Sequence, residues 1–187
     1  MEMLPGLNAG PAPRDFGPWS EPALFRTIRG MQSSPAATST GAPLFVHDFV
    51  AVLLPVDEAT RMFTMIPDSA LAELVAASWN RHAAILRSSD PHCSVSTVCV
   101  SRQGHHFRHD AAIINIGWRG DGGLPTLDAD LELVSFGDTT HLHLMGRYDM
   151  PAHIERFTDV GSLLHRVMVM TVRCFLTELG EALERSR

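Results

Sequence analysis

The chain has 187 residues, of which 45% are hydrophobic and 19% charged, and its formal net charge is −6 at pH 7. This length favours one domain with a sizeable core, and the scattered basic residues, all of them arginine, argue against nucleic acid as the main partner. No apolar run reaches the roughly 18 residues that span a bilayer, and the first residues lack a secretion signal, which predicts a cytoplasmic protein without an integral membrane segment.

Residues 1–43 are rich in Pro, Gly, Ser and Ala, and they predict a flexible N-terminal segment ahead of a single domain over 44–187. Phe16, Trp19 and Phe25 leave a second interpretation open, in which the aromatic part of this segment docks on the domain. No helical or strand periodicity accompanies these three residues, which favours the flexible segment.

The first half of the domain predicts two helices and three strands. The expected elements are, in order, a strand over 44–55, helices over 57–66 and from 68 onward, and strands over 93–102 and 107–118. Asp57 is the expected N-cap of the first helix, and Asp68 or Ser69 that of the second. The glycine of QGHH, at 103–106, predicts a turn between the last two of these strands.

The next segment predicts a β-hairpin that turns at 136–139. Residues 127–135 alternate strictly between apolar and acidic side chains, and 140–148 alternate again beyond the turn. A one-residue slip would turn every side chain to the wrong face, so the leucines of both strands must pair on the inner face. This register places His141 and His143 on a polar outer face. Their expected cross-strand neighbours are Asp130, Glu132 and Val134.

His141 and His143 also leave a metal site open as an alternative. An HxH pair can bind zinc, and His105 and His109 would supply the further ligands if the two hairpins were neighbours. No HExxH or comparable spacing is present. A solvated sheet face without metal or other cofactor is therefore the favoured interpretation.

Residues 159–185 predict a long buried helix with Asp159 as its N-cap. Apolar side chains recur at helical spacing along the segment, and its middle turns are apolar almost all round. A helix of about 26 residues is roughly 39 Å long, which is enough to cross a curved sheet. The element order is therefore a strand, two helices, antiparallel strands and one long helix, which is an α+β arrangement.

This order resembles the helix-grip fold of the START-like superfamily, also called SRPBCC or Bet v-like, over about 44–185. The most specific likeness is to an uncharacterised bacterial group of that superfamily. It lies in LPTLDADLEL after Trp118, in T-x-L-x-L-x-G-x-Y-x-x-P at 140–151, and in H-R-V-x-x-x-T-V-R-x-F-L of the last helix.

The resemblance implies a curved antiparallel sheet wrapped around the C-terminal helix, two shorter helices after the first strand, and a cavity between sheet and helix. Members of the superfamily hold sterols, lipids, polyketides or plant hormones in that cavity. A minority of them carry out cyclisation or dehydration there.

The sequence and this resemblance together predict the binding of a small hydrophobic ligand without catalysis. No GxSxG, P-loop, GxGxxG or Cys–His signature is present. Flexible and aromatic side chains, of the kind that line adaptable pockets, are expected to form the site. The expected ligand-binding residues are Met62, Met65, Trp79, Trp118, Leu131, Leu133, Leu142, Leu144, Tyr148, Met168, Thr171 and Phe175.

A polyketide cyclase or dehydratase that uses the same cavity is the alternative. Such chemistry needs an acid or base in the pocket, for which Tyr148 is the first candidate and His82 and His165 are the others. Arg166 or Arg173 would polarise a carbonyl group. A second alternative is an interaction protein with a filled core, which forms a homodimer through a sheet edge or through the aromatic part of the N-terminal segment.

Overall fold

Five strands form one antiparallel sheet in the order β1-β5-β4-β3-β2. The computed structural model describes residues 43–86, 94–108, 110–149 and 158–186. The elements are β1 (Leu44–Val52), α1 (Val56–Met65), α2 (Asp68–Ala83), β2 (Val98–Arg108), β3 (Ala111–Gly120), β4 (Thr126–Phe136), β5 (Thr139–Asp149) and α3 (Thr158–Arg185). The predicted element order is confirmed, whereas the predicted N-terminal segment and its three aromatic residues lie outside the described residues.

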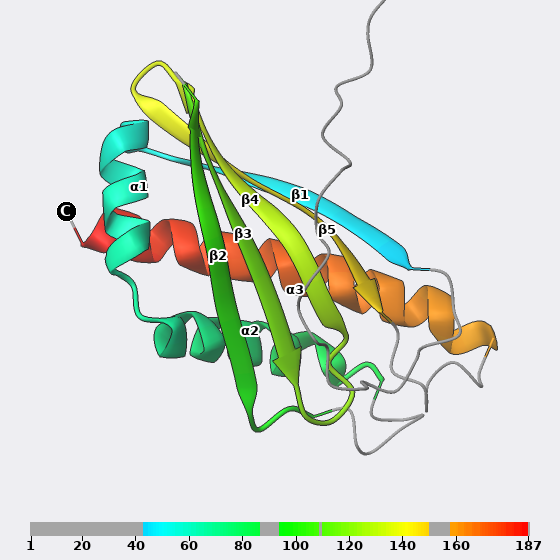
Figure 1. Cartoon of the computed structure of the whole chain (residues 1–187). Helices are drawn as coiled ribbons and strands as arrows, with labels where there is room; N and C mark the ends of the chain where they lie inside the picture. Colours follow the sequence, from blue (N-terminus) through cyan, green and yellow to red (C-terminus); the bar gives the residue numbers. More distant parts are fainter. Residues whose placement is uncertain (1–42, 87–93, 109, 150–157, 187) are drawn as a thin grey trace, which may run out of the picture. The chain divides into compact units, whose positions relative to one another are not determined.

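The sheet curves over α3, which crosses its inner face (Figure 1). α2 runs alongside α3 and packs against β2, and α1 lies near the C-terminal end of α3. This is the helix-grip architecture, so the predicted fold is confirmed. None of the described helices combines the length and the apolar character needed to cross a bilayer.

The β4–β5 hairpin has the predicted register. Leu131 pairs with Leu144, Leu133 pairs with Leu142, and all four leucines are fully buried on the inner face. The predicted turn at 136–139 is also confirmed. The alternation of apolar and polar residues was sufficient to predict this register, because a slip by one residue would have exposed all four leucines.

The turn predicted at 103–106 is wrong. β2 continues through these residues, and Gly104, with a φ of +65°, lies at a β-bulge where the register with β3 shifts. A bulge uses the positive φ of a glycine as readily as a turn does. The chain reverses direction later, between Arg108 and Ala111.

The predicted helix caps are also wrong. Pro55 and Pro67 occupy the N-cap positions of α1 and α2, both with extended backbone angles and without a side-chain capping bond. Asp57 and Asp68 lie in the first turns, where their carboxylates still favour the helix dipole. The fixed φ of proline presets each helix start and takes the place of a polar cap.

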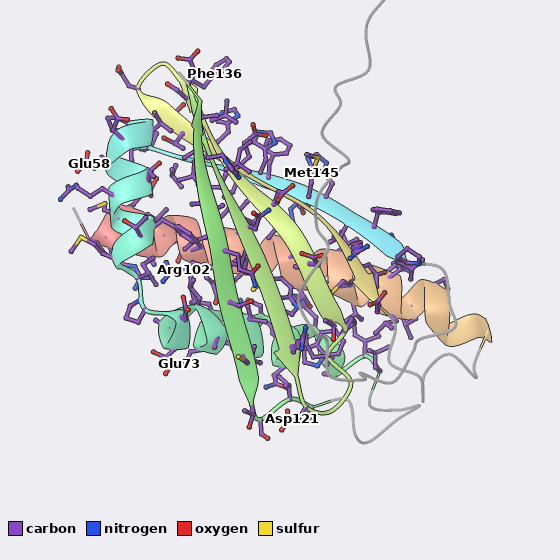
Figure 2. All side chains as sticks on the ribbon, viewed as in Figure 1. Glu58, Glu73, Arg102, Asp121, Phe136 and Met145 are labelled. Atoms are coloured by element: carbon purple, nitrogen blue, oxygen red, sulfur yellow. The ribbon has the colours of Figure 1, made fainter. Side chains whose placement is uncertain are left out.

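Arg102 on β2 joins the sheet to the corner between α1 and α2, where Figure 2 labels it. Its guanidinium donates to the backbone oxygens of Phe63 and Ile66, at 2.9 and 2.8 Å, and pairs with Asp68 at 2.6 Å. It also lies over the Phe63 ring, 5.4 Å from its centroid. One side chain therefore satisfies carbonyls at the end of α1 and fixes the position of α2.

We expect Arg102→Met to lower the free energy of unfolding by about 2–3 kcal/mol, because two carbonyls lose charge-assisted hydrogen bonds while the apolar stem remains. Arg147→Met is the matched control. Arg147 forms an ion pair of 3.3 Å with Asp128 in which both side chains are largely exposed, and such pairs contribute less than about 1 kcal/mol. Urea denaturation measures both changes, and equal losses would contradict the role of Arg102.

Candidate functional site

Aromatic side chains with polar groups gather at one end of the inner face. Trp118 on β3 pairs with Leu127 on β4, and Leu127 pairs with Tyr148 on β5, so the three side chains form a row across the sheet. All three are at most 2% exposed. The half-buried His165, in the N-terminal part of α3, lies against this row.

Tyr148 and His165 form a hydrogen-bonded pair between β5 and α3. The Tyr148 hydroxyl lies 2.7 Å from His165 Nδ1, and the two rings are stacked with their planes 14° apart. Burial raises the pKa of Tyr148 to about 12, so the phenol keeps its proton at neutral pH. With the imidazole neutral, Tyr148 donates to Nδ1 and the His165 proton lies on Nε2. The pair then combines a phenol oxygen that can accept with an imidazole N–H that can donate.

The indole N–H of Trp118 is a buried hydrogen-bond donor, and none of the described residues accepts a hydrogen bond from it. Its ring packs edge-on against Phe175 of α3, with centroids 5.6 Å apart. The Nε1 atom is buried without a hydrogen-bond partner, as is Ser78 Oγ on α2. A buried donor without a partner costs about 1–3 kcal/mol, so an acceptor that reached Trp118 would recover this free energy.

Most of the predicted ligand-binding residues do lie in the interior. Eleven of the twelve are at most 9% exposed: Met62, Trp79, Trp118, Leu131, Leu133, Leu142, Leu144, Tyr148, Met168, Thr171 and Phe175. The four leucines and Phe175 have no exposed surface, so described side chains fill the space beside them. The Thr171 hydroxyl donates to the Val167 carbonyl within α3. Met65 differs from the whole set, because it is 72% exposed and lies outside the core.

The other candidates for proton transfer or carbonyl polarisation lie apart from Tyr148. Arg166 is exposed, and Arg173 is exposed and pairs with Asp48 of β1 at 3.7 Å. His82 on α2 is half-buried, and its pKa is lowered by burial first and by the Arg81 charge second, whereas Glu178 opposes the shift. Of the predicted catalytic side chains, the structure brings together only Tyr148 and His165.

His141 and His143 lie on the outer face, as the hairpin register requires. His143 pairs with Glu132, and His141 pairs with Val134. Their ring neighbours are aromatic side chains as well as imidazoles, a feature that the hairpin pattern did not reveal because it involves β1. No group of three or more His, Cys, Asp or Glu in the described part of the chain has the geometry of a metal site. His109 and the His105 side chain lie outside that part.

A polar groove of about 550 Å³ lies on the outer face, and the sequence analysis did not anticipate it. Its lining comes from β2 to β5: Cys99, Ser101, Gln103, Asn115, Ile116, Gly117, Trp118, Arg119, Thr126, Leu127, Asp128, Arg147 and Asp149. Polar residues at alternate positions are ordinary for the open face of a sheet. Nothing in their spacing therefore distinguishes a groove from a flat surface.

No family model and no curated protein matches the chain. Several solved structures are similar to it, among them the following three. The protein TTHA0849 from Thermus thermophilus has 11% identity and a TM-score of 0.46, over 76% of this chain and 99% of that one. A conserved protein from Geobacillus kaustophilus has 8% identity and a TM-score of 0.42, over 74% of this chain and 97% of that one. The Zhui aromatase/cyclase from Streptomyces sp. R1128 has 16% identity and a TM-score of 0.37, over 78% of this chain and 97% of that one. The fold assignment rests on the strand order and helix packing described above.

Ionisation of Tyr148 can be followed directly, because it is the only tyrosine in the chain. We expect the phenolate absorbance to appear with a midpoint near pH 12 in the folded protein and near pH 10 in the unfolded chain. The raised pKa contributes stability that is fully present below about pH 10 and is lost as the pH rises toward 12. Circular dichroism at each pH reports the folded state, and ionisation near pH 10 while the fold persists would contradict the burial of Tyr148.

Proposed function

We propose that this protein binds a small, largely apolar molecule with one carbonyl or hydroxyl group, at the end of the grip where Trp118, Tyr148 and His165 meet. The observation that carries the proposal is the 2.7 Å Tyr148–His165 hydrogen bond within a largely apolar interior. Buried pockets for such ligands combine apolar walls with a few polar groups that fix orientation.

The polar groups suit an oxygen-bearing ligand. Trp118 Nε1 has a proton to donate and no partner among the described residues, and the Tyr148–His165 pair supports both donation and acceptance. The rings of Trp118, Tyr148 and Phe175 supply apolar contact area in the same region. A carbonyl or hydroxyl placed here would satisfy Trp118 while the rest of the ligand lies against aromatic faces.

Entry of a ligand requires space that the described side chains now fill. α3 lies close to β1 and α2 over more of its length than to β5, and it is not hydrogen-bonded into the sheet as β5 is, so we infer that its N-terminal part is the wall that moves. Met168 is buried in this part of α3, and an unbranched thioether side chain adapts readily to a new neighbour. We infer that binding moves His165 and Met168 and leaves the leucine pairs of the hairpin in place.

Native mass spectrometry of protein purified from its own host tests for a retained hydrophobic molecule. Thermal melting with a panel of fatty acids, sterols and aromatic ketones then identifies the class. We expect Trp118→Phe to weaken binding about 10-fold, because it removes one donor and keeps an aromatic ring. Ser101→Ala, in the outer groove, is the matched control and should leave affinity unchanged. The opposite pattern would place the ligand on the outer face and contradict the proposal.

A second candidate function, cyclisation or dehydration of a polyketide-like chain, is favoured by the same Tyr148–His165 pair. The neutral Tyr148 phenol can give its proton to a substrate hydroxyl group that leaves as water, and the resulting phenolate takes the proton that the neighbouring substrate carbon loses. We expect Tyr148→Phe to abolish turnover of a polyketide-like substrate and to change its affinity by less than about 5-fold, as for the loss of one hydrogen bond. Unchanged turnover would remove Tyr148 from the mechanism and leave binding as the function.

A further inference from the structure

Five rings form a stacked row on the outer face of the sheet. In order they are Phe136, His141, Phe49, His143 and His47, contributed by β4, β5 and β1. Successive centroids lie 5.2, 6.2, 5.4 and 6.1 Å apart, and each pair of planes is within 24° of parallel. Parallel rings do not direct their nitrogen atoms to one point, so the row is not arranged as a metal site.

Large apolar side chains extend this row into a patch. Phe45, Phe49, Phe136 and Met145 are 71%, 53%, 70% and 51% exposed. Figure 2 shows Phe136 at the tip of the β4–β5 hairpin and Met145 on the side of the sheet away from α3. We call these four residues together with His47, His141 and His143 the outer ring patch.

The composition of β1 indicates that this patch is covered. The outer face of β4 has Asp128, Asp130 and Glu132, as expected for a face in water. The outer positions of β1 are Phe45, His47, Phe49 and Ala51, with no charged residue among them. An outer strand face without charged residues is unusual for a sheet face in water, and only the inner face of β1 is covered by described residues.

We propose that the outer ring patch is the interface of a homodimer in which two copies meet face to face about a two-fold axis. Aromatic side chains bury about 150–250 Å² each, so the patch offers on the order of 600 Å² per copy. A standard interface uses about 800 Å² per partner. The patch together with a narrow polar rim reaches that size.

Charge favours an identical partner over a charged one. The patch has no carboxylate or guanidinium, so a strongly charged partner would find no counter-charge in it. Its rim carries both signs, with Arg147 opposite Phe45 and Glu132 opposite His143. A two-fold axis presents the same patch and rim to each copy, so opposite charges can meet across it.

The edge of β1 does not serve as the interface. The Phe49 N–H donates to Asp48 Oδ1 at 2.8 Å, and the Leu53 N–H donates to Glu184 Oε1 at 2.7 Å. Asp48 is an inward-pointing charge on an edge strand, and such residues block strand addition. The two copies therefore associate through the face of the sheet and not by pairing β1 with β1.

The histidines make the dimer sensitive to acid. His143 faces His141, His47 and Glu132, and burial followed by the two neighbouring imidazoles lowers its pKa, against the opposing effect of Glu132. The neutral form of His143 is therefore favoured in the folded protein. Its contribution to the free energy of unfolding is fully present above about pH 6.5 and is lost as the pH falls. Protonation of His143 as the pH falls places a positive charge in the patch of each copy, and the two charges repel each other across the interface.

Sedimentation of the full chain tests the proposal. At neutral pH we expect a species of twice the 20.5 kDa chain mass, and monomer at pH 5 with unchanged circular dichroism. Phe49→Asp should raise the dissociation constant at least about 30-fold, as for the loss of one central residue of an interface. Met65→Asp, on an exposed apolar residue of α1 outside the patch, is the matched control and should leave the dimer intact.

Three outcomes would overturn the proposal. One is a wild-type monomer up to about 0.1 mM, a concentration at which even weak specific dimers form. Another is a dimer that withstands Phe49→Asp, because the copies would then meet through a different surface. The third is a wild-type monomer that sediments with phosphatidylcholine vesicles, which would assign the patch to a lipid surface.

Discussion

The helix-grip arrangement of this protein depends on the close approach of α3 to β1. Gly180 is buried, and a Cβ atom there would lie 2.9 Å from Val52 Cγ1, so only glycine lets the helix come this near the strand. Arg173 and Asp48 add an ion pair between the same two elements. Because β1 is an edge strand, attachment of α3 here leaves the other four strands to curve away over the helix. The distance between α3 and the middle of the sheet is then set by the side chains that fill it.

The kind of side chain that fills this space changes along the sheet. Near the β4–β5 turn the inner face has leucines that pair across the hairpin, and they need no polar partner. At the other end it has Trp118 and Tyr148, whose polar atoms must be satisfied when they are buried. Tyr148 finds His165, whereas Trp118 finds no partner among the described residues. The polar group of the proposed ligand would therefore find a partner at the second end of the sheet and none among the leucines of the first.

The sequence predicted the features that depend on a regular pattern of apolar residues. It did not predict features that depend on a single residue whose type suits more than one local structure. The β4–β5 register and the length of α3 follow from periodicity, because many side chains would be misplaced together if either were different. Gly104 was misassigned because positive φ suits a bulge and a turn equally. Tyr148 and His165 were both candidates, but their contact joins two different elements, β5 and α3, and periodicity within each element does not report a contact between them. The ring row was missed for the same reason, since β1 and β5 are separated by most of the domain.

The proposed ligand site and the proposed dimer interface occupy opposite faces of β5. Tyr148 and Leu144 face inward, and His143 and Met145 face outward, so any movement of this strand would disturb both. β5 also lies between β1 and β4 and is hydrogen-bonded along its length to each. A second copy on the outer face would hold the strand more firmly still. In the proposed site the N-terminal part of α3, which carries His165, is therefore the wall that moves, and the hydrogen-bonded sheet is the fixed wall.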